Sequence, residues 1–411
     1  MSLIRAFAGL RPQPEHTAAV LAPPYDVLSS DEARSMAANR PYSFLHISKP
    51  EIDLPPATDP YSSAVYAKGA ENLQSLIAAH ILKADAQPCY YLYALQMGAH
   101  RQIGLVAVAN VADYDSNRIR KHELTRPDKE DDRVRQIDAL NAQTGPVFLA
   151  YQQHTGLDEL MARVCAAKPE VDVTTPDGII HQLWVIADAA EVDYITQNFD
   201  QMPQLYIADG HHRSAAASRV AAQRRASNPH HTGEEAYNYF LVVIFPDNQL
   251  KILDYNRVIK DLNGLTAPEF LAKLSPAFSV TPSAEIVKPQ QAGEFGMYLA
   301  GQWYCLKIQP SLIPSDPVAS LDVSLLADNL IAPVLGITDQ RRDKRIDFVG
   351  GIRGLGELEK RVNSGEMAVA FALHPTSMHA LMAVADAGQI MPPKSTWFEP
   401  KLADGLVSHL L

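Results

Sequence analysis

Short apolar runs alternate with longer stretches of periodic hydrophobicity along almost the whole chain. The short runs predict buried strands, and the periodic stretches predict helices with one apolar face. Strands are predicted at 20–22, 44–47, 89–97, 101–111, 147–151, 179–187, 205–208, 237–245, 249–253, 303–308, 346–349 and 367–373. Helices are predicted at 29–39, 61–82, 156–168, 189–198, 211–225, 320–335 and 376–385, and a further helix begins near 128.

Two turn sequences separate adjacent strands and predict hairpins. Gly98-Ala99-His100 lies between 89–97 and 101–111, and Pro246-Asp247-Asn248 lies between 237–245 and 249–253. Elsewhere strands alternate with helices, which favours an α/β fold (α+β mixed) with mixed sheets and helices packed on them. The expected domains are an N-terminal α/β domain at 1–115, a central domain at 116–260, a β-rich subdomain or insertion at 261–320, and a C-terminal α/β segment with a docked tail at 321–411.

Composition and charge narrow the class of protein. Apolar residues make up 47% of the 411 residues, enough for the cores of two or three domains. The net charge of −11 argues against a nucleic-acid partner, because such affinity depends on Lys and Arg that neutralise phosphates. No apolar run is long enough to span a membrane, and three scattered cysteines indicate a reducing compartment rather than a disulfide framework. We therefore expect a cytoplasmic protein that binds neither nucleic acid nor a membrane.

The stretch richest in chemistry is the turn between the strand at 205–208 and the Ala-rich helix that follows. Gly210 lets the backbone approach a ligand closely, and the first N–H groups of the helix form an anion site with the helix dipole. Arg213 adds a guanidinium group that can donate two parallel hydrogen bonds to a phosphate, while Asp209 can accept a proton or hold Mg²⁺. Two titratable side chains, His211 and His212, complete the turn. A capped helix start with solvated histidines is the alternative, but the combination favours a ligand site.

Two segments before this turn carry further candidates. The diproline at 23–24 fixes an extended backbone just before Tyr25 and Asp26, which form either a site wall or a structural turn. The polar run at 118–135 contains His122 and Glu123, which could act as base and orienter, and Arg133. Such a charged run can also be a solvated face.

Two segments near the C-terminus also carry candidates. In the tail at 391–400, Lys394, Ser395 and Thr396 could contact phosphate oxygens, although anchoring by the aromatic residues that follow is an equal alternative. The Gly-rich turn at 350–354 could cradle a phosphate, but its spacing matches neither the Walker nor the dinucleotide pattern. A sharp turn between a strand and a helix is the alternative there.

Two resemblances add to these observations. The segment Ala208-Asp209-Gly210-His211-His212-Arg213 resembles the Gly-x-His-Arg signature of the ParB/sulfiredoxin-like fold, whose members bind nucleotide phosphates at this turn, and it is similar to the form found in free-serine kinases. The blocks at 22–27, 121–125, 129–133 and 391–398 resemble a bacterial and archaeal family that carries a domain-of-unknown-function label and often lies near serine-biosynthesis genes. The resemblances imply a ParB/sulfiredoxin-like core around the turn. They also imply ATP or ADP with Mg²⁺ as cofactors, and serine or phosphoserine as the metabolite.

We therefore expect nucleotide-dependent phosphoryl transfer that involves a small hydroxylated metabolite, in the kinase or the phosphatase direction. The candidate catalytic residues are Asp209, His211, His212, Glu123 and Asp26, with Asp209 also the candidate Mg²⁺ ligand. The candidate nucleotide-binding residues are Gly210, Arg213, Lys394, Ser395 and Thr396, and the candidate substrate-binding residues are Tyr25, His122 and Arg133.

Two other functions fit the same residues. One is a nucleotide- or metabolite-binding regulator of serine metabolism that has no turnover. The other is a zinc hydrolase that uses His122, His211 and His212, although two adjacent histidines on a helix have poor ligand geometry.

Overall fold

The computed structural model describes residues 2–411. The chain forms two compact units: unit 1 contains residues 2–250 and Pro400–Leu411, and unit 2 contains Lys251–Glu399. Unit 2 is therefore inserted between two parts of unit 1. This division differs from the four segments predicted from the sequence, because strands from 1–115 and from 116–260 pair in one sheet.

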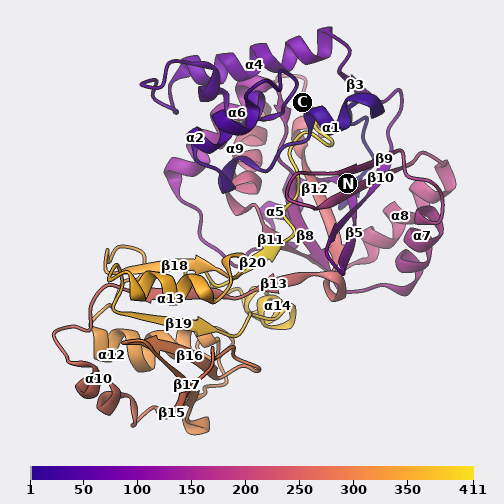
Figure 1. Cartoon of the computed structure of the whole chain (residues 1–411). Coiled ribbons are helices and arrows are strands. Elements are labelled where there is room, and N and C mark those ends of the chain that lie inside the picture. The colour runs from indigo at the N-terminus through magenta and orange to yellow at the C-terminus, as the bar shows by residue number, and fades with distance from the viewer. Residues whose placement is uncertain (1) are drawn as a thin grey trace. The chain divides into compact units, whose positions relative to one another are not determined.

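Unit 1 is built on a nine-stranded mixed sheet. Its strands are β1 (Ile4–Arg5), β4 (Tyr90–Met97), β5 (His100–Asn110), β6 (Ile119–Arg120), β8 (Val147–Tyr151), β9 (Val171–Thr174), β10 (Ile180–Ile186), β11 (Leu205–Asp209) and β12 (Tyr239–Pro246). They lie in the order β6, β11, β8, β12, β5, β4, β10, β9, with β1 also paired to β5. The β11–β6 and β12–β8 pairs are parallel and the others are antiparallel. The central strands β8 and β12 are buried along their whole length, as their almost continuous apolar sequences require. Figure 1 shows helices on both sides of this sheet.

Helices cover this sheet and pack on one another. They are α1 (Thr17–Val20), α2 (Ser30–Ala37), α3 (Leu45–Ser48), α4 (Ser63–Ala78), α5 (Val111–Asp115), α6 (Pro127–Leu140), α7 (Thr155–Cys165), α8 (Ala189–Gln201) and α9 (His211–Ser227). Two short strand pairs complete unit 1: β2 (Leu10–Pro12) pairs with β3 (Leu82–Ala84), and β7 (Ala142–Gln143) pairs with β21 (His409–Leu410). Single turns of 3₁₀ helix lie at η1 (Pro14–His16), η2 (Tyr25–Val27), η3 (Pro50–Asp53), η4 (Ala236–Asn238) and η5 (Asp247–Gln249). The small side chains of α9 let it lie close to α6, where Ala216 and Val220 pack against Val134 and Ile137.

Unit 2 contains a six-stranded antiparallel sheet in the order β15, β17, β16, β19, β14, β18. The strands of unit 2 are β13 (Lys251–Leu253), β14 (Tyr255–Ile259), β15 (Phe278–Ser283), β16 (Glu294–Leu299), β17 (Gln302–Ile308), β18 (Ile346–Gly350), β19 (Val369–Leu373) and β20 (Trp397–Glu399), of which β14 to β19 form the sheet. Its helices are α10 (Ala267–Leu274), α11 (Asp322–Leu326), α12 (Ala332–Leu335), α13 (Gly356–Asn363) and α14 (Met378–Asp386), with 3₁₀ turns η6 (Pro310–Leu312) and η8 (Gly351–Arg353) and the π-helix η7 (Ala327–Ile331). β13 and β20 form a separate pair.

The structure confirms the mixed α/β class and most of the predicted elements, including the β4–β5 hairpin. The predicted helix at 29–39 is observed as α2, which begins with a capping box formed by Ser29 and Glu32. Two predicted strands are wrong: 20–22 lies partly in α1, and 44–47 lies in α3. Periodicity cannot distinguish a short buried helix from a short buried strand. Among residues 2–411, we find no helix with the length and apolar character needed to cross a bilayer.

The predicted hairpin between 237–245 and 249–253 is also wrong. β12 pairs with β5 on one side and with β8 on the other, so both of its edges are taken. β13 instead pairs with β20, almost 150 residues further along the chain. A turn sequence shows that the chain reverses, but it does not show which strand is free to pair.

Candidate functional site

The turn between β11 and α9 depends on Gly210. Its φ is +99°, in the left-handed region where residues with a Cβ are strained. A Cβ at this position would lie 3.3 Å from the Cα of Val147 and 3.3 Å from Nε of Arg213. The β11–β8 register shifts between Ile207 and Asp209, so the strand is irregular just where the turn begins. Glycine therefore lets the chain start α9 directly beside β8.

Arg213 lies in the first turn of α9 with a side chain only 11% exposed. Its Nη1 donates to the carbonyl oxygen of Pro146. Nη2 lies 3.7 Å from Oδ2 of Asp26 and 4.0 Å from Oδ1 of Asp209. Burial by itself lowers the pKa of Arg213, but Asp26 and Asp209 raise it above its ordinary value, so the guanidinium stays charged. The structure thus brings together two carboxylates that are far apart in the sequence.

Asp209 has a second cationic neighbour that the sequence analysis did not identify. Nζ of Lys401 donates to its Oδ2 over 3.1 Å. Burial by itself would raise the pKa of Asp209, but Lys401 and Arg213 hold it well below its ordinary value. The carboxylate is therefore ionised at neutral pH. Lys401 comes from the segment Pro400–Leu411, which returns to unit 1 after unit 2.

His211 and Glu123 form a second group beside the turn. The backbone N–H of His122 points at Nε2 of His211 over 3.4 Å, and Nδ1 of His211 lies 3.7 Å from Oε2 of Glu123. Because Nε2 accepts, the neutral ring carries its proton on Nδ1, facing the carboxylate. The two histidine rings meet edge to face, with centroids 4.5 Å apart. Burial lowers the pKa of His122 to about 4, and burial and then His122 lower that of His211, so both rings are neutral near pH 7.

His212 faces the same polar segment. Its Nε2 accepts a hydrogen bond of 3.1 Å from the backbone N–H of Arg126, just before α6. Burial lowers the pKa of its half-buried ring. Through the two histidines, α9 therefore holds the backbone of segment 122–126 at two points.

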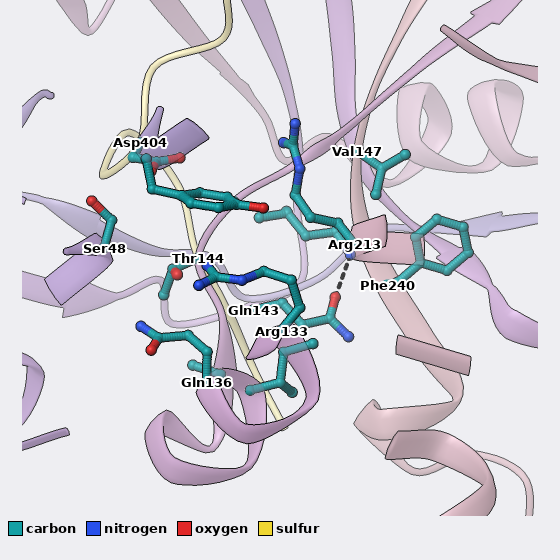
Figure 2. Close-up of a pocket in the computed structure, with 14 residues that line it drawn as sticks. Ser48, Arg133, Gln136, Gln143, Thr144, Val147, Arg213, Phe240 and Asp404 are labelled. Atoms are coloured by element: carbon teal, nitrogen blue, oxygen red, sulfur yellow. Dashed lines mark hydrogen bonds between the residues drawn. The ribbon is translucent and has the colours of Figure 1, made fainter. Parts of the chain in front are cut away.

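Tyr25 and Arg133 line a small pocket with Arg213. The guanidinium of Arg133 stacks on the Tyr25 ring, 3.9 Å from its centroid, and also donates to Oδ2 of Asp132 over 2.6 Å. Burial raises the pKa of Tyr25 to about 12. The pocket has a volume of about 40 Å³. Its lining residues are Tyr25, Ser48, Arg133, Gln136, Ile137, Ala142, Gln143, Thr144, Gly145, Val147, Arg213, Phe240, Leu241 and Asp404 (Figure 2).

Asp404 is the second residue that the sequence analysis missed. It is 2% exposed, and burial raises its pKa to about 7. Its Oδ1 has no hydrogen-bond partner within the part of the chain that the structure describes. Lys401 and Asp404 are charged residues in a mostly apolar C-terminal segment, which is the one sequence signal that could have identified them.

The tail makes several hydrogen bonds within unit 2. Nη1 and Nη2 of the buried Arg257 donate to the carbonyl oxygens of Lys394 (3.0 Å) and Pro393 (3.2 Å). The hydroxyl of Ser395 donates to the carbonyl of Pro392 over 2.7 Å, and Thr396 is half-buried in the same segment. These hydrogen bonds hold residues 392–395 within unit 2, and phosphate binding by Lys394, Ser395 and Thr396 stays a prediction.

The Gly-rich turn after β18 has a steric explanation. A Cβ on Gly350 would lie 2.8 Å from the ring of Trp397, and one on Gly351 would lie 2.3 Å from Oδ1 of Asp254. These glycines let β18 pack against neighbouring groups of unit 2. The structure thus favours the sharp-turn alternative over a phosphate cradle.

The side chains around the turn are not arranged as a metal-binding site. Within residues 2–411, no group of three or more His, Cys, Asp or Glu side chains is placed to hold a metal ion. The nearest partners of Asp209 are the cations Lys401 and Arg213, and one ring nitrogen each of His211 and His212 accepts from a backbone N–H. The arrangement therefore does not support a zinc site at these histidines, and Mg²⁺ binding by Asp209 stays a prediction.

Comparison with known families identifies the chain. The sequence pattern of the family described as "Protein of unknown function (DUF1015)" matches residues 4–324. The chain belongs to this family. The resemblance to a domain-of-unknown-function family is thereby confirmed. Comparison with the curated proteins gives no match.

Several solved structures are similar to the chain at low identity. A free serine kinase in complex with AMP has 14% identity and a TM-score of 0.36, covering 73% of this chain and 92% of its own. A conserved hypothetical protein from Pyrococcus furiosus has 14% identity and a TM-score of 0.36, with coverages of 74% and 95%. SbnI with a C-terminal truncation from Staphylococcus aureus has 11% identity and a TM-score of 0.40, with coverages of 74% and 87%. At these scores the similarity supports no assignment of activity.

Proposed function

We propose that the chain transfers a phosphoryl group between a nucleotide and a small hydroxylated metabolite at the turn between β11 and α9. The observation that carries the proposal is the nearly complete burial of the charged Arg213 in the first turn of α9. Its guanidinium and the first backbone N–H groups of the helix form a set of donors for phosphate oxygens. Phosphoryl transfer depends mainly on positioning and on neutralising charge, and these donors can provide both.

The resemblance of the Asp-Gly-His-His-Arg turn to that of free-serine kinases supports ATP or ADP as the nucleotide and serine or phosphoserine as the metabolite. The small pocket beside Arg213 supports a ligand that inserts a compact polar group, because its volume is only about 40 Å³. The nucleotide would meet the start of α9, and the reacting group of the metabolite would enter the pocket.

The other candidates take supporting roles in this proposal. His211 is neutral and directs its Nδ1 proton toward Glu123, so the pair holds segment 122–126 against the start of α9. Asp209 stays ionised with a strongly lowered pKa, which makes it a weak proton acceptor. Its role would be to orient the two cations, Lys401 and Arg213, toward a phosphate.

The cations of the proposed site can neutralise phosphate charge, and Mg²⁺ binding by Asp209 remains a prediction. Mg²⁺ commonly binds one or two carboxylates together with substrate phosphates, but the carboxylate of Asp209 is already paired with an ammonium 3.1 Å away. We therefore assign the charge neutralisation to Arg213, Lys401 and the helix start.

The test is nucleotide binding and turnover by an Arg213→Ala variant, with Arg219→Ala as the matched control. Arg219 lies two turns further along α9 and is paired with Glu130 and Asp131 away from the turn. We expect Arg213→Ala to weaken nucleotide binding by about 1.5–3 kcal/mol, the range for hydrogen bonds to charged groups, and Arg219→Ala to leave it unchanged. Calorimetry measures both affinities.

Two outcomes would count against the proposal. Equal nucleotide affinity in the two variants would remove Arg213 from the phosphate site. Binding without any turnover of serine, phosphoserine or other hydroxylated metabolites would instead favour the nucleotide-binding regulator.

A further inference from the structure

Two residues that line the pocket beside Arg213 each carry a buried polar atom without a partner. Oδ1 of Asp404 and Oγ of Ser48 make no hydrogen bond to any described residue, although the two residues are only 2% and 6% exposed. Buried polar atoms without partners are rare and costly. The free oxygen of Asp404 on the lining of this pocket indicates a ligand that donates a hydrogen bond there.

The free oxygen of Asp404 and the guanidinium chain of Arg213 border the same space. A Cβ added to Gly145 would lie 3.4 Å from Cδ of Arg213 and 3.6 Å from Oδ1 of Asp404. The bare Cα of Gly145 therefore leaves room between them for one small group. A metabolite hydroxyl in this space would lie next to the residue that we propose holds the phosphate.

The backbone fixes Asp404 firmly in this place. Its N–H donates to the carbonyl of Ala22 over 2.9 Å, and its own carbonyl accepts from Ala22 over 3.2 Å. Gly405 follows with φ of +87°, against the Phe44 ring, where a Cβ would lie 2.7 Å from the ring carbons. The carboxyl group is thus preorganised rather than carried on a mobile tail.

The protonation behaviour of Asp404 suits a base that works near neutral pH. Burial raises its pKa to about 7, while Arg213 and, more weakly, Arg133 oppose the rise. The other groups that face it are Asp26, which raises the pKa further, and the backbone N–H of Tyr25, which lowers it. A general base is most effective when its pKa lies near the working pH.

We propose that Asp404 is a catalytic residue whose Oδ1 takes the proton of the metabolite hydroxyl as that oxygen attacks the terminal phosphorus of the nucleotide. A new O–P bond forms to the metabolite, and the bond between this phosphorus and the bridging oxygen breaks. The electron pair of the broken bond stays on the shortened nucleotide, and the hydroxyl proton moves to Asp404. This inference rests on the proposed function.

The test compares Asp404→Asn with Asp322→Asn in the whole chain. Asp322, in α11 of unit 2, is a matched control: burial raises its pKa to about 6, its Oδ2 has no partner among residues 2–411, and Oδ1 accepts from the Gly293 N–H. We expect Asp404→Asn to lower kcat by about 10²–10⁴-fold, the usual contribution of a general base, with nucleotide affinity and Tm retained. Asp322→Asn should leave kcat unchanged.

The pH profile separates catalysis from a structural role. A base must be ionised, so wild-type kcat/KM should fall as the pH drops below about 7, and Asp404→Asn should lose this dependence on the acid side. Gly145→Ala provides an independent probe, because its methyl group makes only ordinary contacts but occupies the space for the hydroxyl. We expect it to raise KM for the metabolite without lowering nucleotide affinity.

Three results would overturn the inference. Unchanged kcat in Asp404→Asn beside an active wild type would remove Asp404 from the reaction and leave the proposed function standing. An equal loss in Asp404→Asn and Asp322→Asn would show a general effect of buried carboxyl groups. A wild type that binds nucleotide but transfers no phosphoryl group to any hydroxylated metabolite would overturn both the inference and the proposed function.

Discussion

At the scale of single residues, the site is an arrangement of charges whose environments differ. Asp209 and Asp404 are both carboxyl groups near Arg213, yet the pKa of Asp209 is strongly lowered and that of Asp404 is raised to about 7. The difference follows from their partners, because Asp209 has an ammonium at 3.1 Å whereas Oδ1 of Asp404 has no partner among the described residues. One group can therefore remain a fixed charge while the other exchanges a proton.

Gly210 provides a prediction at this scale. We expect Gly210→Ala to destabilise the protein by about 1–3 kcal/mol, the cost of a strained backbone conformation, because φ is +99° and the Cα of Val147 lies 3.3 Å from the added Cβ. Gly98→Ala is a suitable comparison, since φ there is +59° and nothing lies within 4 Å. Denaturant unfolding would show a larger loss for Gly210→Ala, and equal losses would mean that contact with β8 adds nothing.

At the scale of elements, the C-terminal segment Pro400–Leu411 acts as a strap across unit 1. Leu10 and Ser408 exchange backbone hydrogen bonds, and β21 pairs with β7. The strap thereby carries Lys401 and Asp404 to the turn formed by β11 and α9. The positions of Lys401 and Asp404 are therefore set by the backbone pairing of this segment with distant parts of unit 1.

The ion pair made by this strap predicts a stability effect that depends on pH. Lys401→Met should lower the free energy of unfolding at pH 7 by about 1 kcal/mol, a value kept small because both side chains are partly exposed. The pKa of Asp209 is lowered in the folded state, so the stabilisation is present above its unfolded pKa of about 3.9 and is lost as the pH falls through the lower folded value.

The measurement is urea unfolding of wild type and Lys401→Met at pH 7 and at successively lower pH. The difference should shrink as Asp209 takes up its proton. Lys68→Met, which removes an exposed pair with Glu71 on α4, is the control and should show little effect at either pH. A difference that is constant with pH would mean that Lys401 acts through packing alone.

At the scale of the whole molecule, unit 2 is an insertion that leaves and rejoins unit 1 at adjacent points. Lys251 pairs directly with Glu399 in the β13–β20 ladder, so the two ends of the insertion lie next to each other. Each unit has its own buried apolar cluster, in unit 1 around β5 and β12 and in unit 2 around β14 and β19. These features meet the requirements for a separable domain.

We therefore predict that unit 1 folds when residues 251–399 are replaced by a Gly–Ser linker of about four residues, a length that spans neighbouring strands. Circular dichroism and cooperative unfolding would show a folded unit 1. The Arg213 site should still bind nucleotide, with a loss on Arg213→Ala similar to that in the whole chain. A shortened protein that does not unfold cooperatively would show that unit 1 depends on the insertion.

The sequence by itself determined the local structure around the candidate turn. The apolar run at 205–208, the glycine and the Ala-rich stretch specify a strand, a left-handed residue and a helix through interactions between near neighbours, and the structure has β11, Gly210 at φ +99° and α9. The capping box at Ser29 and Glu32 follows from the same kind of local rule. The interactions behind these signals involve only residues a few positions apart, so the structures can be predicted without knowledge of the fold.

Tertiary structure decided which distant residues meet. Asp26 reaches Arg213 across 187 positions, and Lys401 reaches Asp209 across 192, because the strap and the turn at Tyr25 are placed by backbone pairing with elements elsewhere. The wrong hairpin after β12 has the same origin, since β5 and β8 had already taken both edges of that strand. Pairing and burial depend on competition among all segments of the chain, and a local sequence pattern carries no information about that competition.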